Sequence, residues 1–136
     1  MENNRFAIAV KCVIHNGKDI LLLRKTKKEM IGDASNNSWD LPGGRIQYKE
    51  TVSQAVEREI REEVALHIET MQIKSAATVI RPDGTHLVIL LHSCLSNERN
   101  VSLSKEHEMY KCFKQEELLS DTSIPEWIKD SVEKCI

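Results

Sequence analysis

The sequence has few aromatic side chains and no excess of positive charge. Aromatic residues make up 4% of the 136 residues, and the formal net charge is −2. Proteins that bind nucleic acids usually present a clustered basic face. This composition therefore argues against a nucleic-acid polymer as the main partner.

Long apolar runs are also missing. A membrane-spanning helix needs ~20 consecutive apolar residues, and no stretch of the sequence approaches that length. The most apolar stretch near the N-terminus, 6–14, is too short for a signal peptide and lacks its flanks. We therefore expect a cytoplasmic protein with no membrane partner.

The four cysteines, Cys12, Cys94, Cys112 and Cys135, are widely scattered. Without a CxxC spacing, neither a zinc cluster nor a disulfide framework is expected. Cys12 and Cys94 lie in apolar runs, which favours small buried side chains. A catalytic Cys–His pair is the alternative, but no local signature supports it.

The sequence also lacks repeats, low-complexity tracts and linkers. Its composition, 40% hydrophobic and 29% charged, is that of a globular protein. A chain of this length can form one core, so we expect a single domain over 1–136.

Apolar patterns predict alternating strands and helices. Strands over 5–15 and 19–24 flank an Asn16-Gly17 turn and should form a hairpin. The nearly continuous apolar run 86–95 suits a central strand covered on both faces. The fold class is therefore α/β (α+β), with a mixed sheet between helices. Other expected elements are strands over 39–41, in two pieces of 67–80 and over 108–113, and a helix over 125–136 that packs through Trp127, Ile128 and Val132.

A polar segment, 26–38, is expected to be an exposed loop. Its Lys27 and Lys28 either face an anionic substrate or are simply solvated.

The most informative segment is a predicted helix over 51–65, with Thr51 and Gln54 as an approximate capping box. Its apolar stripe consists of Val52, Ala55, Val56 and Ile60. Glu59 and Glu63 fall inside this stripe, and Glu62 lies at its edge. Buried carboxylates are costly unless they are paired or bind a cation.

These three glutamates converge because residues at i, i+3 and i+4 are neighbours on a helix. Three carboxylates without Cys or His nearby indicate a hard ion, Mg²⁺ or Mn²⁺. The preceding bend, 42–44, can add a backbone oxygen. Such an ion often binds substrate phosphates and activates water, and a remaining glutamate can accept the proton. An ordinary solvated helix with Glu–Arg ion pairs is the alternative.

The spacing of this segment resembles the MutT/Nudix hydrolase signature. The matching residues, spread over 23 positions, are Gly44, Glu50, Arg58, Glu59, Ile60, Glu62, Glu63 and Leu66. Trp39 and 41–44 also resemble the segment that leads into the family's motif. The resemblance implies a single Nudix domain with an α/β/α sandwich and a mixed central sheet. It also implies hydrolysis of a nucleoside diphosphate linked to another group.

The resemblance assigns catalytic roles to Glu50, Arg58, Glu59, Glu62 and Glu63, with Glu50 orienting Arg58. The implied metal ligands are the Gly44 carbonyl, the carboxylates of Glu59, Glu62 and Glu63 and, as a further ligand or base, Glu106. Mg²⁺ is the implied cofactor, with Mn²⁺ as a substitute, and relatives are often homodimers.

Two departures from the family pattern stand out. Ala65 occupies the position of the motif's closing glycine; if that position needs a positive φ, alanine costs on the order of 1 kcal/mol. Met109 and Cys112 stand where relatives often have Glu and Trp, which weakens the transfer of substrate specificity from those relatives.

A nucleoside triphosphate, cleaved to monophosphate and pyrophosphate, is the expected substrate. The first strand begins near Arg5, which leaves no room for the additional N-terminal piece of ADP-ribose-type relatives. ADP-ribose, a dinucleotide, a nucleotide sugar or a non-nucleotide diphosphate is the alternative, followed by a non-catalytic nucleotide-binding module. Four aromatic residues either stack on a base or belong to the core: Trp39, Tyr48, Tyr110 and Phe113.

Overall fold

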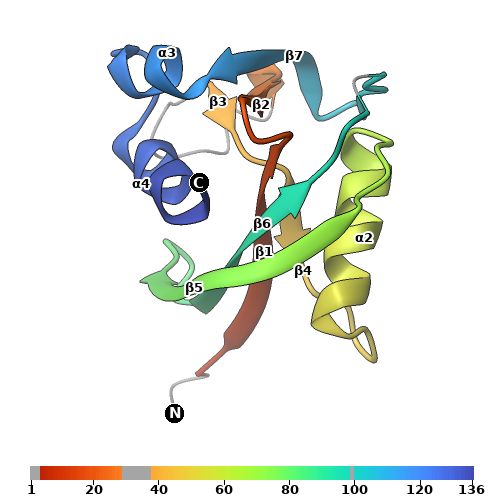
Figure 1. Ribbon diagram of the computed structural model, residues 1–136. Coiled ribbons are helices and arrows are strands. Elements are labelled where there is room, and N and C mark those ends of the chain that lie inside the picture. Colours follow the sequence, from red (N-terminus) through yellow and green to blue (C-terminus); the bar gives the residue numbers. More distant parts are fainter. Residues whose placement is uncertain (1–3, 29–37, 99) are drawn as a thin grey trace.

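The computed structural model describes residues 4–28, 38–98 and 100–136, which form a mixed sheet between helices (Figure 1). The predicted α+β class is confirmed. The strands are β1 (Phe6–His15), β2 (Asp19–Lys25), β3 (Trp39–Asp40), β4 (Gly43–Arg45), β5 (Thr70–Ile80), β6 (His86–Leu95) and β7 (His107–Lys114). The helices are α2 (Val52–Glu63), α3 (Gln115–Ser120) and α4 (Glu126–Cys135).

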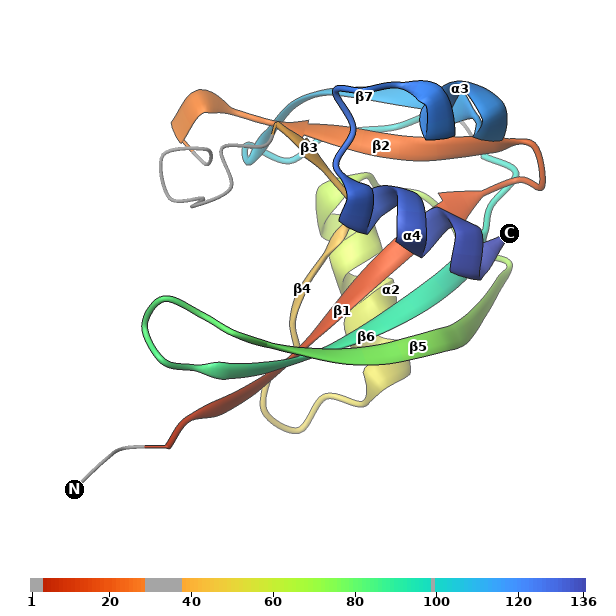
Figure 2. The same cartoon turned by 90° about the vertical axis from the view of Figure 1, so that its left-hand side faces the viewer.

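Strand β1 is central to the sheet, whose order is β3-β2-β1-β6-β5. It runs parallel to β6 along its whole length, whereas it pairs with β2 only at Ile14 and His15. Nearer its N-terminus it pairs with β4 over Ala9–Lys11. β2 therefore diverges from β1 and carries β3 and β7 with it, as Figure 2 shows.

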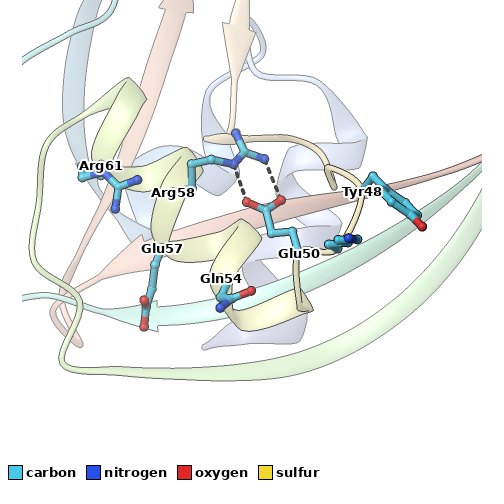
Figure 3. Close-up of a pocket in the computed structure, with 7 residues that line it drawn as sticks. Tyr48, Glu50, Gln54, Glu57, Arg58 and Arg61 are labelled. Atoms are coloured by element: carbon cyan, nitrogen blue, oxygen red, sulfur yellow. Dashed lines mark hydrogen bonds and ion pairs between the residues drawn. The ribbon is translucent and has the colours of Figure 1, made fainter.

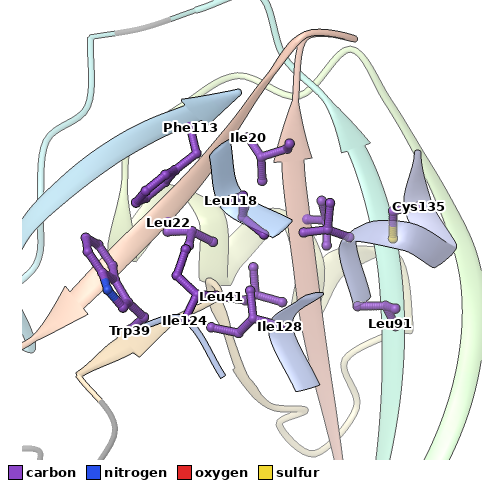
Figure 4. Packing of buried hydrophobic residues seen from close by; sticks show 12 residues of the cluster. Ile20, Leu22, Trp39, Leu41, Leu91, Phe113, Leu118, Ile124, Ile128 and Cys135 are labelled. Atoms are coloured by element: carbon purple, nitrogen blue, oxygen red, sulfur yellow. The ribbon is translucent and has the colours of Figure 1, made fainter. Parts of the chain in front are cut away.

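Alternating side chains of β1 and β2 supply two separate cores. Val10, Cys12 and Ile14 pack with Ala55, Val56 and Ile60 of α2. On the opposite face, residues of β1, β2 and β7 pack with α3 and α4 (Figure 4). Helices thus cover both faces, which gives the expected α/β/α sandwich. This second core contains Val13, Ile20, Leu22, Trp39, Leu41, Leu91, Phe113, Leu118, Ile124, Ile128, Val132 and Cys135.

Several predicted elements are present with different limits. The segment 67–80 holds one strand, β5, with a bulge between Ile73 and Ser75, so the prediction of two pieces is wrong. Pro125 caps α4 instead of lying in its first turn. Neither β4 nor α3 was predicted. β4 forms because its three residues pair with β1, a contact distant in sequence.

Four further predictions have mixed outcomes. Cys12 and Cys94 are buried, as predicted. Trp127, predicted to pack on the sheet, is 41% exposed. Most of the predicted loop 26–38 lies outside the described residues, although Lys27 and Lys28 are exposed. No helix in the described part of the chain is long and apolar enough to span a membrane.

A left-handed residue follows helix α2 and its C-cap. Ala65 has φ 57°, and its N–H donates to the Ile60 carbonyl at 2.9 Å. The αL conformation brings Cβ close to the following carbonyl oxygen in residues other than glycine. The backbone therefore needs the conformation that the family's closing glycine adopts easily.

We predict that Ala65→Gly stabilises the protein by about 0.5–1 kcal/mol, because relief of αL strain exceeds the entropy that glycine adds to the unfolded chain. Urea unfolding monitored by circular dichroism measures the change. Ala77→Gly, at an exposed position of β5, is the matched control and should destabilise by roughly 0.5–1 kcal/mol. Equal destabilisation by both variants would contradict the strain at Ala65.

Candidate active site

Helix α2 presents two carboxylates on its buried face. Thr51 and Gln54 form the predicted capping box, with hydrogen bonds of 2.9 and 3.1 Å. Glu59 is 8% exposed and Glu63 is 6% exposed, so both lie inside the apolar stripe as predicted. Val52, also assigned to that stripe, is 36% exposed. The helix is therefore anchored mainly by Ala55, Val56 and Ile60.

Arg58 connects this helix with the loop before it. Its Nε and Nη2 atoms donate to the two carboxylate oxygens of Glu50, at 2.5 and 3.0 Å. This bidentate pair raises the pKa of Arg58 and lowers that of Glu50. Nη2 also donates to the Arg45 carbonyl at 3.1 Å. The pair thereby fixes the chain between β4 and α2.

The same guanidinium also holds two helix carboxylates. Nη1 donates to Glu59 Oε1 at 2.9 Å and to Glu62 Oε2 at 3.2 Å. The Glu59 carboxylate lies against Gly44, where an added Cβ would be 2.5 Å from Oε1. Gly44 thus leaves the space that the Glu59 carboxylate occupies.

Glu63 lies on the other side of this contact, against the bend at Gly43. The Gly43 N–H donates to Glu63 Oε2 at 3.1 Å. Gly43 has φ 151°, and a Cβ there would come 2.1 Å from the Val10 carbonyl oxygen, so only glycine fits. Burial raises the pKa of Glu63 to about 8, although the Lys11 charge and the Gly43 N–H act in the opposite direction. The carboxyl is therefore largely protonated at neutral pH when no cation is present.

The remaining predicted ligands are not brought into this group. The Glu62 side chain is 54% exposed and pairs with Arg58. Glu106 is exposed in the turn before β7, and its carbonyl accepts a hydrogen bond from the Thr26 N–H at 3.2 Å. Within 4–28, 38–98 and 100–136, no three His, Cys, Asp or Glu side chains are grouped to hold a metal. The structure thus unites Glu59 and Glu63 with the Gly43–Gly44 bend.

These groups suit a hard divalent cation. Two buried carboxylates one helical turn apart repel each other, and a cation between them removes that cost. All the donors are oxygens, as Mg²⁺ and Mn²⁺ prefer. Glu59, Glu63 and the Gly44 carbonyl would hold the ion, and Glu62 would join them on leaving Arg58.

A shallow pocket of about 340 Å³ has the Glu50–Arg58 pair in its lining (Figure 3). It is lined by Tyr48, Lys49, Glu50, Gln54, Glu57, Arg58 and Arg61. Neither Glu59 nor Glu63 lines it. The pocket is therefore separate from the two buried carboxylates.

A second polar cluster, not predicted from the sequence, lies near these carboxylates. Asp40 Oδ1 accepts hydrogen bonds from Lys11 Nζ at 3.0 Å and from the Leu41 N–H at 2.9 Å. Its Oδ2 lies 3.5 Å from Nε2 of the buried His107. Burial opposes ionisation, but Lys11 and His107 outweigh it and lower the pKa of Asp40 to about 2. Lys11, the one charged residue in the apolar run 6–14, was the available sequence signal.

The aromatic candidates divide between core and surface. Trp39 and Phe113 are buried and contact each other edge to face, with ring centroids 5.3 Å apart. They belong to the core and are not available to stack on a base. Tyr48 is 92% exposed and Tyr110 is 40% exposed.

The chain matches known proteins in sequence and in structure. A family model, the NUDIX domain, matches residues 5–135. The chain is 35% identical over 77 residues to the "Uncharacterized Nudix hydrolase YvcI" of Bacillus subtilis, which covers 57% of this chain and 44% of that protein. It is 31% identical over 90 residues to the "Nucleoside triphosphatase NudI" of Klebsiella pneumoniae, covering 59% of this chain and 64% of that protein. These matches span less than two thirds of either relative.

The fold is shared with solved structures. The MutT protein from Methanosarcina mazei superposes with a TM-score of 0.79 at 24% sequence identity. The superposition covers 98% of this chain and 95% of that one. It therefore confirms the predicted architecture over nearly the whole chain.

We predict that Glu63→Gln stabilises the metal-free protein increasingly as the pH rises. The folded pKa of Glu63, about 8, lies above its ordinary value of 4.5, so the unfolded chain loses this proton first. Wild-type stability should therefore fall between about pH 5 and pH 8, at up to about 1.4 kcal/mol per unit of pKa difference.

Urea unfolding in EDTA at pH 5, 6.5 and 8 measures this difference. Glutamine is always neutral, so the advantage of Glu63→Gln should grow across the series and reach a few kcal/mol at most. Glu57→Gln, at an exposed position of the same helix, is the control and should show no such trend. A constant difference at the three pH values would contradict the raised pKa.

Proposed function

The chain belongs to the NUDIX domain family, the MutT/Nudix hydrolases, and we propose that it is a Mg²⁺-dependent pyrophosphohydrolase. Its proposed reaction splits a nucleoside triphosphate into a monophosphate and pyrophosphate. The observation that carries this proposal is the burial of Glu59 and Glu63 against the Gly43–Gly44 bend. Two buried carboxyl groups one helical turn apart are costly for folding, but they suit a divalent-cation site.

Each residue of the site has a distinct part in this proposal. Glu59, Glu62, Glu63 and the Gly44 carbonyl act as metal ligands. When bound, Mg²⁺ supplies neutralisation of the phosphate charge and a lowered pKa for bound water. Arg58, clamped by Glu50, fixes the position of Glu59 and so orients the ligand set. Glu106, on the turn before β7, is the proposed further ligand or proton acceptor.

The substrate class is supported by a relative. NudI of Klebsiella pneumoniae is named a nucleoside triphosphatase, which favours a nucleoside triphosphate here. ADP-ribose, a dinucleotide or a nucleotide sugar is the alternative within the same chemistry. A non-catalytic nucleotide-binding module is less favoured because every carboxylate of the family motif is present. Substitution of Mn²⁺ for Mg²⁺, the homodimer and the cytoplasmic location stay predictions.

Replacement of a buried carboxylate should lower the hydrolytic activity while the protein stays folded. We predict that Glu59→Gln and Glu63→Gln each lower kcat/KM on the order of 10²-fold or more, because each removes charge stabilisation at the reacting phosphates. Release of pyrophosphate from nucleoside triphosphates in Mg²⁺ is the measurement. Glu57→Gln, on the exposed face of α2, is the control and should retain full activity.

Two observations keep this test decisive. Circular dichroism and thermal unfolding in EDTA should show both variants folded. Added Mg²⁺ should raise the Tm of the wild type more than that of either variant. Full activity of both variants would refute the proposed site. Nucleotide binding without turnover of triphosphates, ADP-ribose or dinucleotides would instead identify a binding module.

A further inference from the structure

A single lysine interrupts the apolar run of β1. Lys11 lies between Val10 and Cys12, which pack against α2, so strand alternation directs its side chain to the α4 face. In the β1–β4 ladder Lys11 is the partner of Gly43, whose N–H donates to Glu63. The lysine therefore lies across the bend from the candidate metal ligands.

The amine of Lys11 is held in place by two hydrogen-bond acceptors of the described chain. Its Nζ donates to Asp40 Oδ1 at 3.0 Å and to the Leu41 carbonyl at 3.1 Å. An ammonium group has three N–H donors, and among the residues that the structure describes only these two acceptors bind Nζ, which leaves one donor for a ligand. The side chain retains 24% of its exposure, which gives a ligand access. A buried ion pair is weak as a source of stability, so packing alone does not explain a lysine at this position.

An exposed indole lies next to this amine. Trp127, in the first turn of α4, is 41% exposed, while Ile128 on the same helix is fully buried. Lys11 Nζ lies 5.9 Å from the centroid of the Trp127 ring. Trp39, by contrast, is a buried part of the core. A large exposed aromatic surface beside a fixed cation is suited to an aromatic anion.

We propose that Lys11 and Trp127 form the recognition side of the active site, with Lys11 binding a substrate phosphate and Trp127 stacking on the nucleobase. This inference rests on the proposed function, because it names the groups that bind the same nucleotide. From Glu63 past Gly43 to Lys11 and Trp127, the site presents carboxylates, then a cation and then an aromatic surface. A nucleotide presents its groups in a matching spatial order, with the polyphosphate at one end and the base at the other. Asp40 is a positioning residue that keeps the amine at the bend.

Variants of the two residues should affect the binding of different parts of the substrate. Trp127→Ala should raise KM for a nucleoside triphosphate about 10-fold, within the range of stacking contributions, and leave inhibition by inorganic tripolyphosphate unchanged. Trp127→Phe should restore most of the loss. Lys11→Met should weaken the binding of both the nucleotide and tripolyphosphate by similar factors, about 10-fold or more. Lys11→Arg should retain the binding of both.

Two exposed positions provide matched controls. Lys18→Met removes a charge beyond the end of β1, and Phe6→Ala removes an aromatic ring that is 71% exposed at the other end of that strand. Neither variant should change KM. An unchanged KM for the nucleotide in Trp127→Ala, or unchanged tripolyphosphate inhibition in Lys11→Met, would overturn the proposal while leaving the hydrolase function intact.

A binding measurement separates this inference from the catalytic proposal. In a Trp39→Phe background Trp127 is the single indole of the chain. A nucleoside triphosphate should quench its fluorescence, and tripolyphosphate should not. If the wild type hydrolyses no nucleotide, the proposed function fails, and quenching still decides whether Trp127 contacts a base. Absence of quenching at saturating nucleotide would overturn the stacking role.

Discussion

The burial of Glu59 and Glu63 on one face of α2 is the constraint on which the site depends. Two carboxylates one turn apart, 8% and 6% exposed, oppose folding unless a cation, a proton or a donor compensates them. Arg58 compensates Glu59, and the Gly43 N–H with a retained proton compensates Glu63. The protein is therefore less stable than it would be with an apolar helix face, but the site favours a divalent cation.

The bend before the helix is shaped by the same constraint. Gly43 brings the backbone against Val10, and Gly44 leaves room for the Glu59 carboxylate. The Glu50–Arg58 pair then fixes the loop between β4 and α2. These contacts tie the bend, the loop and the helix together, so a change in any of them alters the position of the carboxylates.

The divergence of β2 from β1 lets residues from the opposite face of the sheet reach the bend. Because β1 pairs with β2 only at Ile14 and His15, its N-terminal half is left to pair with β4. Lys11 therefore lies beside the bend instead of beneath β2. Trp127 reaches it from α4, a helix more than a hundred residues later in the chain. Carboxylates and recognition groups thus approach the bend from the two opposite layers of the sandwich.

The sequence by itself determined the acidic helix, its capping box, the burial of Glu59 and Glu63 and the contact of Glu50 with Arg58. These features depend on helical periodicity and on residues fewer than ten positions apart, so local spacing specifies them. Only the tertiary structure decided that β4 pairs with β1, that Asp40 holds Lys11 and that Trp127 stays exposed beside it. Those contacts join residues about 30 to 116 positions apart, and no local pattern encodes which distant strands and helices meet.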